Sequence, residues 1–339
     1  MSYRTATTAV TAVALLLAGC TGEPDHTRDP DTRDADPSPT SNTVTLVTQD
    51  SFALSDGLLE RFEKESGLTV EVNVVGDAGT LANELVSTKD APLGDVVFGV
   101  DNTFMSRVTD EGVTEVNYLR QVGEADVCVN ADKTWFADRG LPVPQDLDDL
   151  IDPRYRGLLV VPDPATSSLG LAFLLAAVDE YGDTGGGGYW AALEENGVKG
   201  AGSWEDAYHG DFTGAGGTGD RPLVVSYSTS PAGTVGDDGK PTTAALLETC
   251  FRHEEYAGLL AGARNRGGGK DLLSFLLSDA VQQDVPASMS LYPADDGTKL
   301  PADWVKHAPR AEDPYELDPE EIAESREAWV EAWTAITFG

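Results

Sequence analysis

The sequence predicts an α/β fold with mostly parallel sheets flanked by helices. Strand-like and helix-like segments alternate from Thr43 onward, the order typical of parallel α/β proteins. The continuous apolar run before Asp101 (Val96 to Val100) is typical of a strand buried on both faces. About 300 residues follow Asn42, a length that suits two lobes better than one core.

The first part of the chain predicts a β-α-β-α-β order. The elements are a strand over 43–47, a helix with Leu58, Leu59 and Phe62 at core spacing that ends at Gly67, a strand over 68–75, a helix over 81–86, and a strand over 95–100. This order implies a parallel sheet with right-handed crossovers.

The cycle restarts after Asn130. The predicted elements are a strand over 158–161, a helix over 169–181, a strand over 223–227, a helix over 268–277 and a C-terminal helix over 322–336. Trp329 and Trp333 lie at helical spacing in the last of these, so we expect them to pack in the core. The glycine-rich stretches 185–188 and 214–219 are expected to be surface loops.

The N-terminus has the pattern of an export signal. An apolar run from Ala6 to Ala18 follows Arg4 and is too short to span a bilayer. It ends in Ala-Gly-Cys, which resembles a bacterial lipobox. Residues 1–20 are therefore interpreted as a lipoprotein signal peptide, with Cys20 becoming the lipidated first residue. An ordinary cleaved signal peptide with an incidental cysteine is the alternative.

Residues 21–42 predict a disordered tether. They are rich in Asp, Pro, Thr and Ser and contain no large apolar residue, so they cannot bury enough surface to offset the entropy of ordering. With a lipidated Cys20, we expect the protein to be exported and anchored to the outer face of the cytoplasmic membrane, with no other membrane contact.

The charge balance excludes one class of partner. Asp and Glu number 58 against 23 Lys and Arg, a formal net charge of −35. Such a surface repels nucleic acid and anionic lipid, so no nucleic-acid partner is expected. It would attract cationic solutes, but acidity spread over the surface for solubility explains the same charge.

Two cysteines remain besides Cys20. Cys128 and Cys250 both lie in strand-like runs, and an exported protein meets an oxidising environment in which disulfides persist. We therefore expect a bond between them, with two separately buried thiols as the alternative.

The sequence supports no catalytic or metal site. It contains no HExxH, GxSxG, CxxC or P-loop pattern, and residues 266–270 lack the Walker spacing. The four histidines are scattered along the chain, at His26, His209, His253 and His307. We expect no enzyme activity, no metal and no cofactor, although the residues alone leave enzyme chemistry unsupported rather than excluded.

Six short segments occur in an order that points to a known family. They are TQDSF (48–52), DVVFGVDN (95–102), DPATSS with Gly170 (163–168), SWEDAY (203–208), SYSTSP (226–231) and LYP (291–293). Each is weak alone, but as an ordered set from Thr43 to about Pro293 they resemble the periplasmic thiamine-binding proteins of ABC transporters.

The resemblance implies a two-lobed type II periplasmic-binding-protein fold with two hinge crossings, in which closure of the lobes clamps the ligand. Lobe 1 would comprise 43–127 and 251–339, including the C-terminal helix, and lobe 2 would comprise 128–250. Cys128 and Cys250 then fall at the two crossings, which the family's topology places side by side. This supports the expected disulfide.

The resemblance also implies a ligand, namely thiamine or a phosphorylated or pyrimidine relative, delivered to an ABC transporter permease by a monomeric receptor. Such a cation needs aromatic faces, carboxylates and small polar groups, at the strand ends where open α/β sheets bind ligands. The residues expected to supply them are Asp50, Ser51, Asp101, Thr166, Ser167, Trp204, Tyr208, Tyr227, Ser228, Ser230 and Ser290.

Some roles and the ligand stay open at this point. Trp204 could instead be a core anchor, and Asp101 a local cap. Gln49 and Ser290 stand where enteric members of the family carry aromatic residues, which reduces the aromatic surface available to a cation. Rival readings are a receptor for iron(III), a receptor for a polyamine, or a thiaminase-I-like enzyme using Cys128 as its nucleophile.

Overall fold

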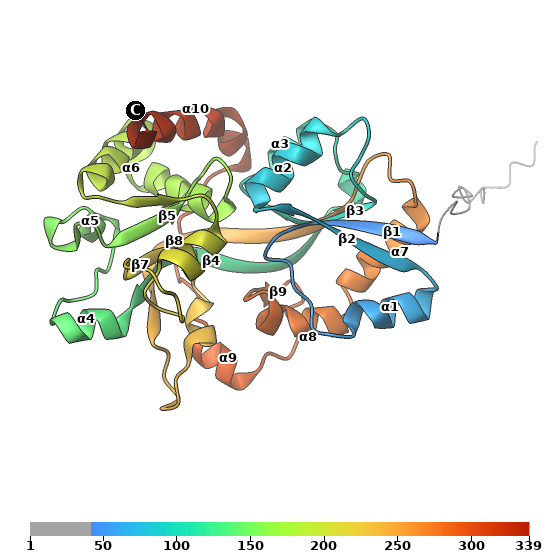
Figure 1. Cartoon of the computed structure of the whole chain (residues 1–339). Coiled ribbons are helices and arrows are strands. Elements are labelled where there is room, and N and C mark those ends of the chain that lie inside the picture. Colours follow the sequence, from blue (N-terminus) through green and yellow to red (C-terminus); the bar gives the residue numbers. More distant parts are fainter. Residues whose placement is uncertain (1–41, 339) are drawn as a thin grey trace, which may run out of the picture. The chain divides into compact units, whose positions relative to one another are not determined.

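The structure is a computed structural model and describes residues 42–338 (Figure 1). The predicted signal peptide, the lipidated Cys20 and most of the predicted tether lie outside these residues. None of the described helices is both long enough and apolar enough to cross a membrane.

The described strands form one sheet in the order β2-β1-β3-β8-β4-β7-β5-β6, with β9 paired to β4. Their bounds are β1 Thr43–Gln49, β2 Thr69–Gly76, β3 Val96–Asp101, β4 Arg120–Asp132, β5 Leu159–Pro162, β6 Lys199–Ala201, β7 Leu223–Tyr227, β8 Thr243–Leu259 and β9 Tyr292–Pro293. β1 pairs in parallel with β2 and β3, and β5 in parallel with β6 and β7, as the alternation of elements predicts.

Helices cover the sheet. Their bounds are α1 Leu58–Ser66, α2 Ala78–Ser87, α3 Met105–Asp110, α4 Lys133–Arg139, α5 Leu147–Leu150, α6 Ser168–Glu195, α7 Arg266–Leu276, α8 Asp279–Ser288, α9 Ala302–His307 and α10 Pro319–Phe338. We call the part around β1–β3 the first lobe and the part around β5–β7 the second lobe. The long strands β4 and β8 lie between them and run into both (Figure 1).

Local sequence signals explain the ends of several elements. α1 ends where Gly67 adopts a left-handed conformation (φ 74°), and its N–H bonds back to the Glu63 carbonyl. Its apolar face buries Phe62, as predicted. α2 begins at Asp77, whose side chain accepts a 2.7 Å hydrogen bond from the N–H of Ala78.

The prediction of a loop at 185–188 is wrong. These glycines lie inside α6, which is kinked at Gly182 (φ 72°, ψ 169°) and then continues as helix to Glu195. Tyr189, Trp190 and Leu193 follow the glycines and are buried. Their packing outweighs the low helix propensity of glycine. The second glycine-rich stretch, 214–219, is a loop, as predicted.

The C-terminal helix α10 contacts both lobes. Trp329 and Trp333 are buried, as predicted, and face α6: the Trp329 indole donates to Asp183 at 3.1 Å, and Trp333 meets Trp190 edge-on. On the other side, Glu327 pairs with Arg107 of α3 at 3.0 Å. The predicted boundaries between lobes stay a prediction.

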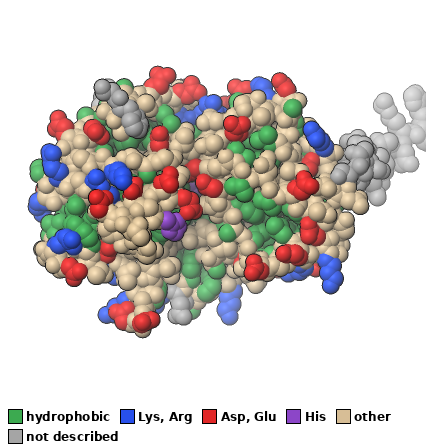
Figure 2. Space-filling model, in the orientation of Figure 1, with side chains coloured by type: hydrophobic (Ala, Val, Ile, Leu, Met, Phe, Trp, Pro, Cys, Tyr) green, Lys and Arg blue, Asp and Glu red, His purple; other side chains and the backbone are tan. Residues whose placement is uncertain are grey.

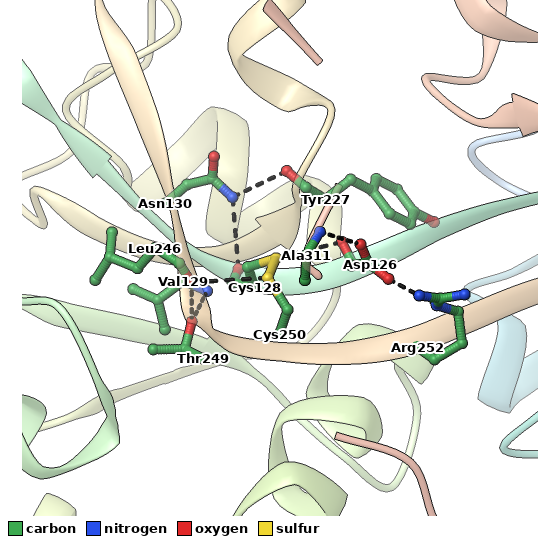
Figure 3. The surroundings of a disulfide bond; sticks show 10 residues. All are labelled: Asp126, Cys128, Val129, Asn130, Tyr227, Leu246, Thr249, Cys250, Arg252 and Ala311. Carbon is green, nitrogen blue, oxygen red and sulfur yellow. Dashed lines mark hydrogen bonds and ion pairs between the residues drawn. A yellow bond between two sulfur atoms is a disulfide. The ribbon is translucent and has the colours of Figure 1, made fainter. Parts of the chain in front are cut away.

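The expected disulfide is present. Cys128 on β4 and Cys250 on β8 are bonded, with Cα atoms 4.2 Å apart (Figure 3). The ladder between β4 and β8 is interrupted here, because Val127 pairs with Phe251 while Val129 pairs with Leu246. The hydroxyl of Thr249 accepts a 2.9 Å bond from the N–H of Val129 and replaces part of the missing ladder.

Candidate ligand-binding cleft

A cavity of about 420 Å³ lies between the two lobes, a size typical of small-molecule sites. Its lining comes from the ends of β1 and β7, from Glu255 within β8, and from the segments around Trp204 and Ser290. The lining residues are Gln49, Asp50, Ser51, Phe52, Ala53, Trp204, Glu205, Tyr208, His209, Ala215, Tyr227, Ser230, Gly233, Glu255, Ser288, Met289 and Ser290.

Three aromatic rings form one wall of the cavity. Trp204 and Tyr208 are stacked, with ring centroids 5.1 Å apart, and the ring of Tyr227 lies 6.2 Å from Trp204. Tyr208 belongs to a π-helical segment (Asp206–Asp211), and Tyr227 ends β7. Aromatic faces in this arrangement attract organic cations.

Trp204 is both a lining and a packing residue. Its indole N–H donates to Ser226 Oγ at 3.0 Å, and that hydroxyl is 2.9 Å from Ser230 Oγ. The ring is half-buried and packs against the hydrophobic core. Trp204 therefore lines the cavity and also anchors the core, and its role in binding stays a prediction.

Carboxylates line or adjoin the cavity beside this wall. Asp50 follows β1, Asp77 caps α2 and Glu255 lies on β8. Burial raises the pKa of Asp50, and Asp206 adds to the effect. Burial is also the main cause that raises the pKa of Asp77 to about 6 and that of Glu255 to about 8.

Asp101 does not line the cavity. It ends β3 and is buried, and its Oδ1 accepts bonds from the N–H of Thr103 (2.8 Å) and the Thr103 hydroxyl (2.5 Å). This is the local cap considered as its alternative role. Across the sheet it pairs with Glu255, which does reach the cavity.

The structure brings seven of the eleven predicted site residues to the cavity: Asp50, Ser51, Trp204, Tyr208, Tyr227, Ser230 and Ser290. Their role in binding stays a prediction. Thr166, Ser167 and Ser228 do not line it. Ser167 and Ser228 are fully buried, and the Thr166 hydroxyl donates to the carbonyl of Gly202 at 3.0 Å.

Several residues that line the cavity were not predicted from the sequence. Glu255 is the most consequential, and its signal was weak because glutamates are common throughout this acidic chain. Gln49 stands where enteric members of the resembling family carry an aromatic residue, and its side-chain amide donates to the Glu255 carboxylate. The other lining residues that were not predicted are Phe52, Ala53, Glu205, His209, Ala215, Gly233, Ser288 and Met289.

Hydrogen bonds join the lobes around the cavity. The N–H of Thr80 on α2 donates to the Thr166 carbonyl at 3.2 Å, and a Cβ at Gly79 would lie 2.6 Å from that same oxygen, so the close approach requires glycine. The Thr229 hydroxyl donates to the carbonyl of Ser290, whose backbone is left-handed (φ 58°). The cleft is in a closed arrangement.

The charge on one face of the molecule is dispersed. On the face shown in Figure 2, acidic side chains are spread over the surface and are not gathered in one patch. Within residues 42–338, no group of three or more His, Cys, Asp or Glu side chains is placed to hold a metal ion.

Known proteins of similar sequence or structure include several that are named as binding proteins. The Thiamine-binding periplasmic protein of Escherichia coli K12 is 28% identical over 86% of this chain and 92% of its own length. A solved periplasmic thiamin binding protein superposes with a TM-score of 0.78 at 24% identity, covering 88% of this chain and 96% of its own. The ferric binding protein from Campylobacter jejuni superposes with a TM-score of 0.67 at 13% identity, covering 87% and 100%.

These likenesses confirm the predicted two-lobed type II periplasmic-binding-protein fold. Residues 46–284 match the bacterial extracellular solute-binding proteins, and this match spans more than half of the chain. The chain therefore belongs to the family of bacterial extracellular solute-binding proteins.

Proposed function

We propose that this protein is the solute-binding subunit of an ABC importer and binds thiamine, or a phosphorylated or pyrimidine relative, in the cleft between its lobes. The observation that carries this proposal is the wall of Trp204, Tyr208 and Tyr227 beside the carboxyl groups of Asp50 and Glu255. Thiamine has a fixed thiazolium charge and an aminopyrimidine ring, which suit aromatic faces and carboxylates. Relatives named for thiamine binding support the same ligand.

Binding and closure are coupled in this scheme. Trp204 and Tyr227 belong to the second lobe, and Asp50 follows β1 of the first. A ligand that touches both sides stabilises the closed state more than the open one, so it shifts the population toward closure. The closed, loaded receptor then delivers the solute to a membrane permease. We propose that it acts as a monomer, without catalysis and without a cofactor.

Mass spectrometry of the small molecule retained by the purified exported protein tests this function directly. Calorimetric titration with thiamine, thiamine monophosphate, iron(III) and spermidine then ranks the candidate ligands. We expect thiamine or its phosphate to bind most tightly. Preferential binding of iron(III) or spermidine would favour one of the rival receptors instead.

The enzyme alternative has its own test. Cys128 is disulfide-bonded and fully buried, and a sulfur in this state cannot act as a nucleophile. We expect no free thiol at Cys128 in the exported protein and no cleavage of thiamine during long incubation with added nucleophile. Cleavage by the oxidised protein would contradict the assignment as a receptor.

We also propose that Cys20 is lipidated and anchors the protein. The support is the Leu-Ala-Gly-Cys sequence that ends at Cys20, outside the residues that the structure describes. Replacing Cys20 by Ser should release the protein from membranes or block its maturation. Unchanged partitioning of Cys20→Ser between membrane and soluble fractions would show that the anchor is assigned wrongly.

A further inference from the structure

Glu255 occupies an unusual position for a carboxyl group. It is only 2% exposed, yet it lines the ligand cavity. The Gln49 side-chain amide donates to one of its oxygens, and Asp101 lies directly opposite it on β3. A carboxylate in such a place has lost most of its hydration, which strongly disfavours its charged form unless a cation replaces the water.

The groups around Glu255 do not supply that cation. Asp101 on β3 and Asp77 at the start of α2 are the charged neighbours that act on it, and both disfavour its ionisation. β4 places Gly123 opposite it. β7 contributes the ring of Tyr227, a phenol whose pKa lies well above its usual value because of burial.

The other titratable groups near Glu255 do not supply a positive charge either. On β8 itself, burial lowers the pKa of His253, so its imidazole is neutral. Asp50, Glu205 and His209 line the same cavity, with His209 Nε2 3.6 Å from Glu205. No Lys or Arg is among the described residues that line it.

In this closed arrangement the cleft therefore favours a protonated Glu255 when no cation lies beside it. Burial is the largest cause that raises its pKa to about 8, and the two neighbouring aspartates raise it further, while the Gln49 amide opposes them. At neutral pH the group holds its proton until a positive charge comes close enough to stabilise the anion.

We propose that Glu255 determines the specificity of the cleft for cations, by exchanging its proton for the positive charge of the ligand. In this exchange the O–H bond of Glu255 breaks, the proton passes to water or buffer, and the carboxylate is left facing the cation. The inference rests on the proposed binding of a thiamine-like cation in this cleft.

The exchange has consequences for selectivity and pH. A fixed cation such as thiazolium pairs with the carboxylate, whereas a neutral molecule of the same shape leaves Glu255 protonated and loses this attraction. Where release of one proton accompanies binding, affinity rises up to about tenfold per pH unit and levels off above about pH 8.

Calorimetry of the full exported protein tests the exchange with thiamine as the probe. Titrations near neutral pH in two buffers of different ionisation enthalpy give the number of protons released, which we expect to be roughly one per ligand. In Glu255→Gln, which resembles the protonated form, the release should fall close to zero. Its affinity should match wild type within about threefold near pH 6 and be weaker by about tenfold or more near pH 8.5.

Glu254→Gln is the matched control. Glu254 is the adjacent residue on β8, does not line the cavity, and accepts a 2.6 Å bond from the Tyr256 hydroxyl. This variant should release the same number of protons as wild type. Thiamine binding without proton release, or equal release in Glu255→Gln, would overturn the inference and leave the proposed function standing.

A second measurement does not depend on thiamine. The side-chain carboxyl ¹³C resonance of Glu255, identified by its loss in Glu255→Gln, should titrate in the ligand-free protein well above the ordinary range for glutamate. Titration near the ordinary value overturns the inference whatever ligand binds. If Glu255 titrates high but thiamine fails to bind at any pH, the proposed function fails, and with it the exchange for this ligand.

Discussion

The main-chain N–H of Trp204 donates a 3.1 Å hydrogen bond to the carboxylate of Asp77 and thereby joins the two lobes beside the ligand cleft. The same carboxylate accepts from the N–H of Ala78 and caps α2. The Asp77 side chain thus caps a helix of the first lobe and also binds the backbone of Trp204 in the second lobe. Formation of this bond requires the lobes to be closed.

Asp77→Ala should favour the open form. It removes both hydrogen bonds, and loss of the N-cap alone should cost about 0.5 to 2 kcal/mol of stability. We expect a larger radius of gyration in small-angle scattering without ligand and a lower melting temperature. Asp77→Asn keeps one acceptor oxygen, so its radius of gyration and melting temperature should lie between those of the Ala variant and wild type. An unchanged radius in the Ala variant would show that the contact does not control closure.

Removing a ring from the aromatic wall should weaken ligand binding. We expect Trp204→Ala or Tyr227→Ala to reduce the affinity for thiamine by on the order of 1 to 2 kcal/mol, roughly tenfold or more. Both rings also contact the core, so Trp204→Phe and Tyr227→Phe serve as controls that keep an aromatic face. Calorimetry and thermal melts together separate binding from packing. A variant that melts much earlier yet binds normally would place the site elsewhere.

Glu255 should make stability depend on pH. Its pKa rises from 4.5 to about 8 on folding, so the folded state holds more protons between these values. The stabilisation from protonation is complete below about pH 4.5 and is lost as the pH rises to about 8. Glu255→Gln avoids this loss. Relative to wild type, the free energy of unfolding of this variant should therefore increase by up to roughly 5 kcal/mol between about pH 4.5 and about pH 8.

Urea unfolding of both proteins near pH 5.5 and near pH 8.5 measures this difference, with Glu254→Gln as the control. If the difference in unfolding free energy between Glu255→Gln and wild type does not widen with pH, Glu255 is ionised in the folded protein at neutral pH.

The disulfide should contribute to stability more than to binding. It closes a segment with a sequence separation of 122, for which loss of chain entropy in the unfolded state predicts about 4 to 5 kcal/mol. The double variant Cys128→Ala, Cys250→Ala should therefore melt at a lower temperature and still bind ligand, because neither cysteine lines the cavity. Loss of binding in a variant that remains folded at the assay temperature would indicate that the bond positions the lobes.

The regular part of the fold follows from local patterns. The run ending at Val100 is apolar throughout because β3 is buried on both faces, and Gly67 ends α1 because only glycine adopts that conformation at little cost. The helix over 185–188 could not be predicted from such patterns. It depends on burial of Tyr189 and Trp190, which lie far from their core partners in the sequence.

Local sequence patterns likewise predict only some of the residues in the candidate site. The aromatic wall could be predicted because its residues lie in short segments that resemble a known family. Asp101 lies at a strand end, as predicted. Its carboxylate, however, accepts a hydrogen bond from the N–H of Thr103, and strand patterns in the sequence do not reveal this local contact. Glu255 gave only a weak signal because carboxylates are abundant in this chain. Only its burial in the folded cleft distinguishes it from the others.

The bond between Cys128 and Cys250 also makes the chain between them a covalently closed ring. A protease that cuts once inside this ring, for example in the loop 214–219, leaves a single covalent molecule, because the disulfide still joins the two pieces. The fragments separate only after reduction. A receptor exposed outside the cytoplasmic membrane therefore keeps both lobes together after one such cut.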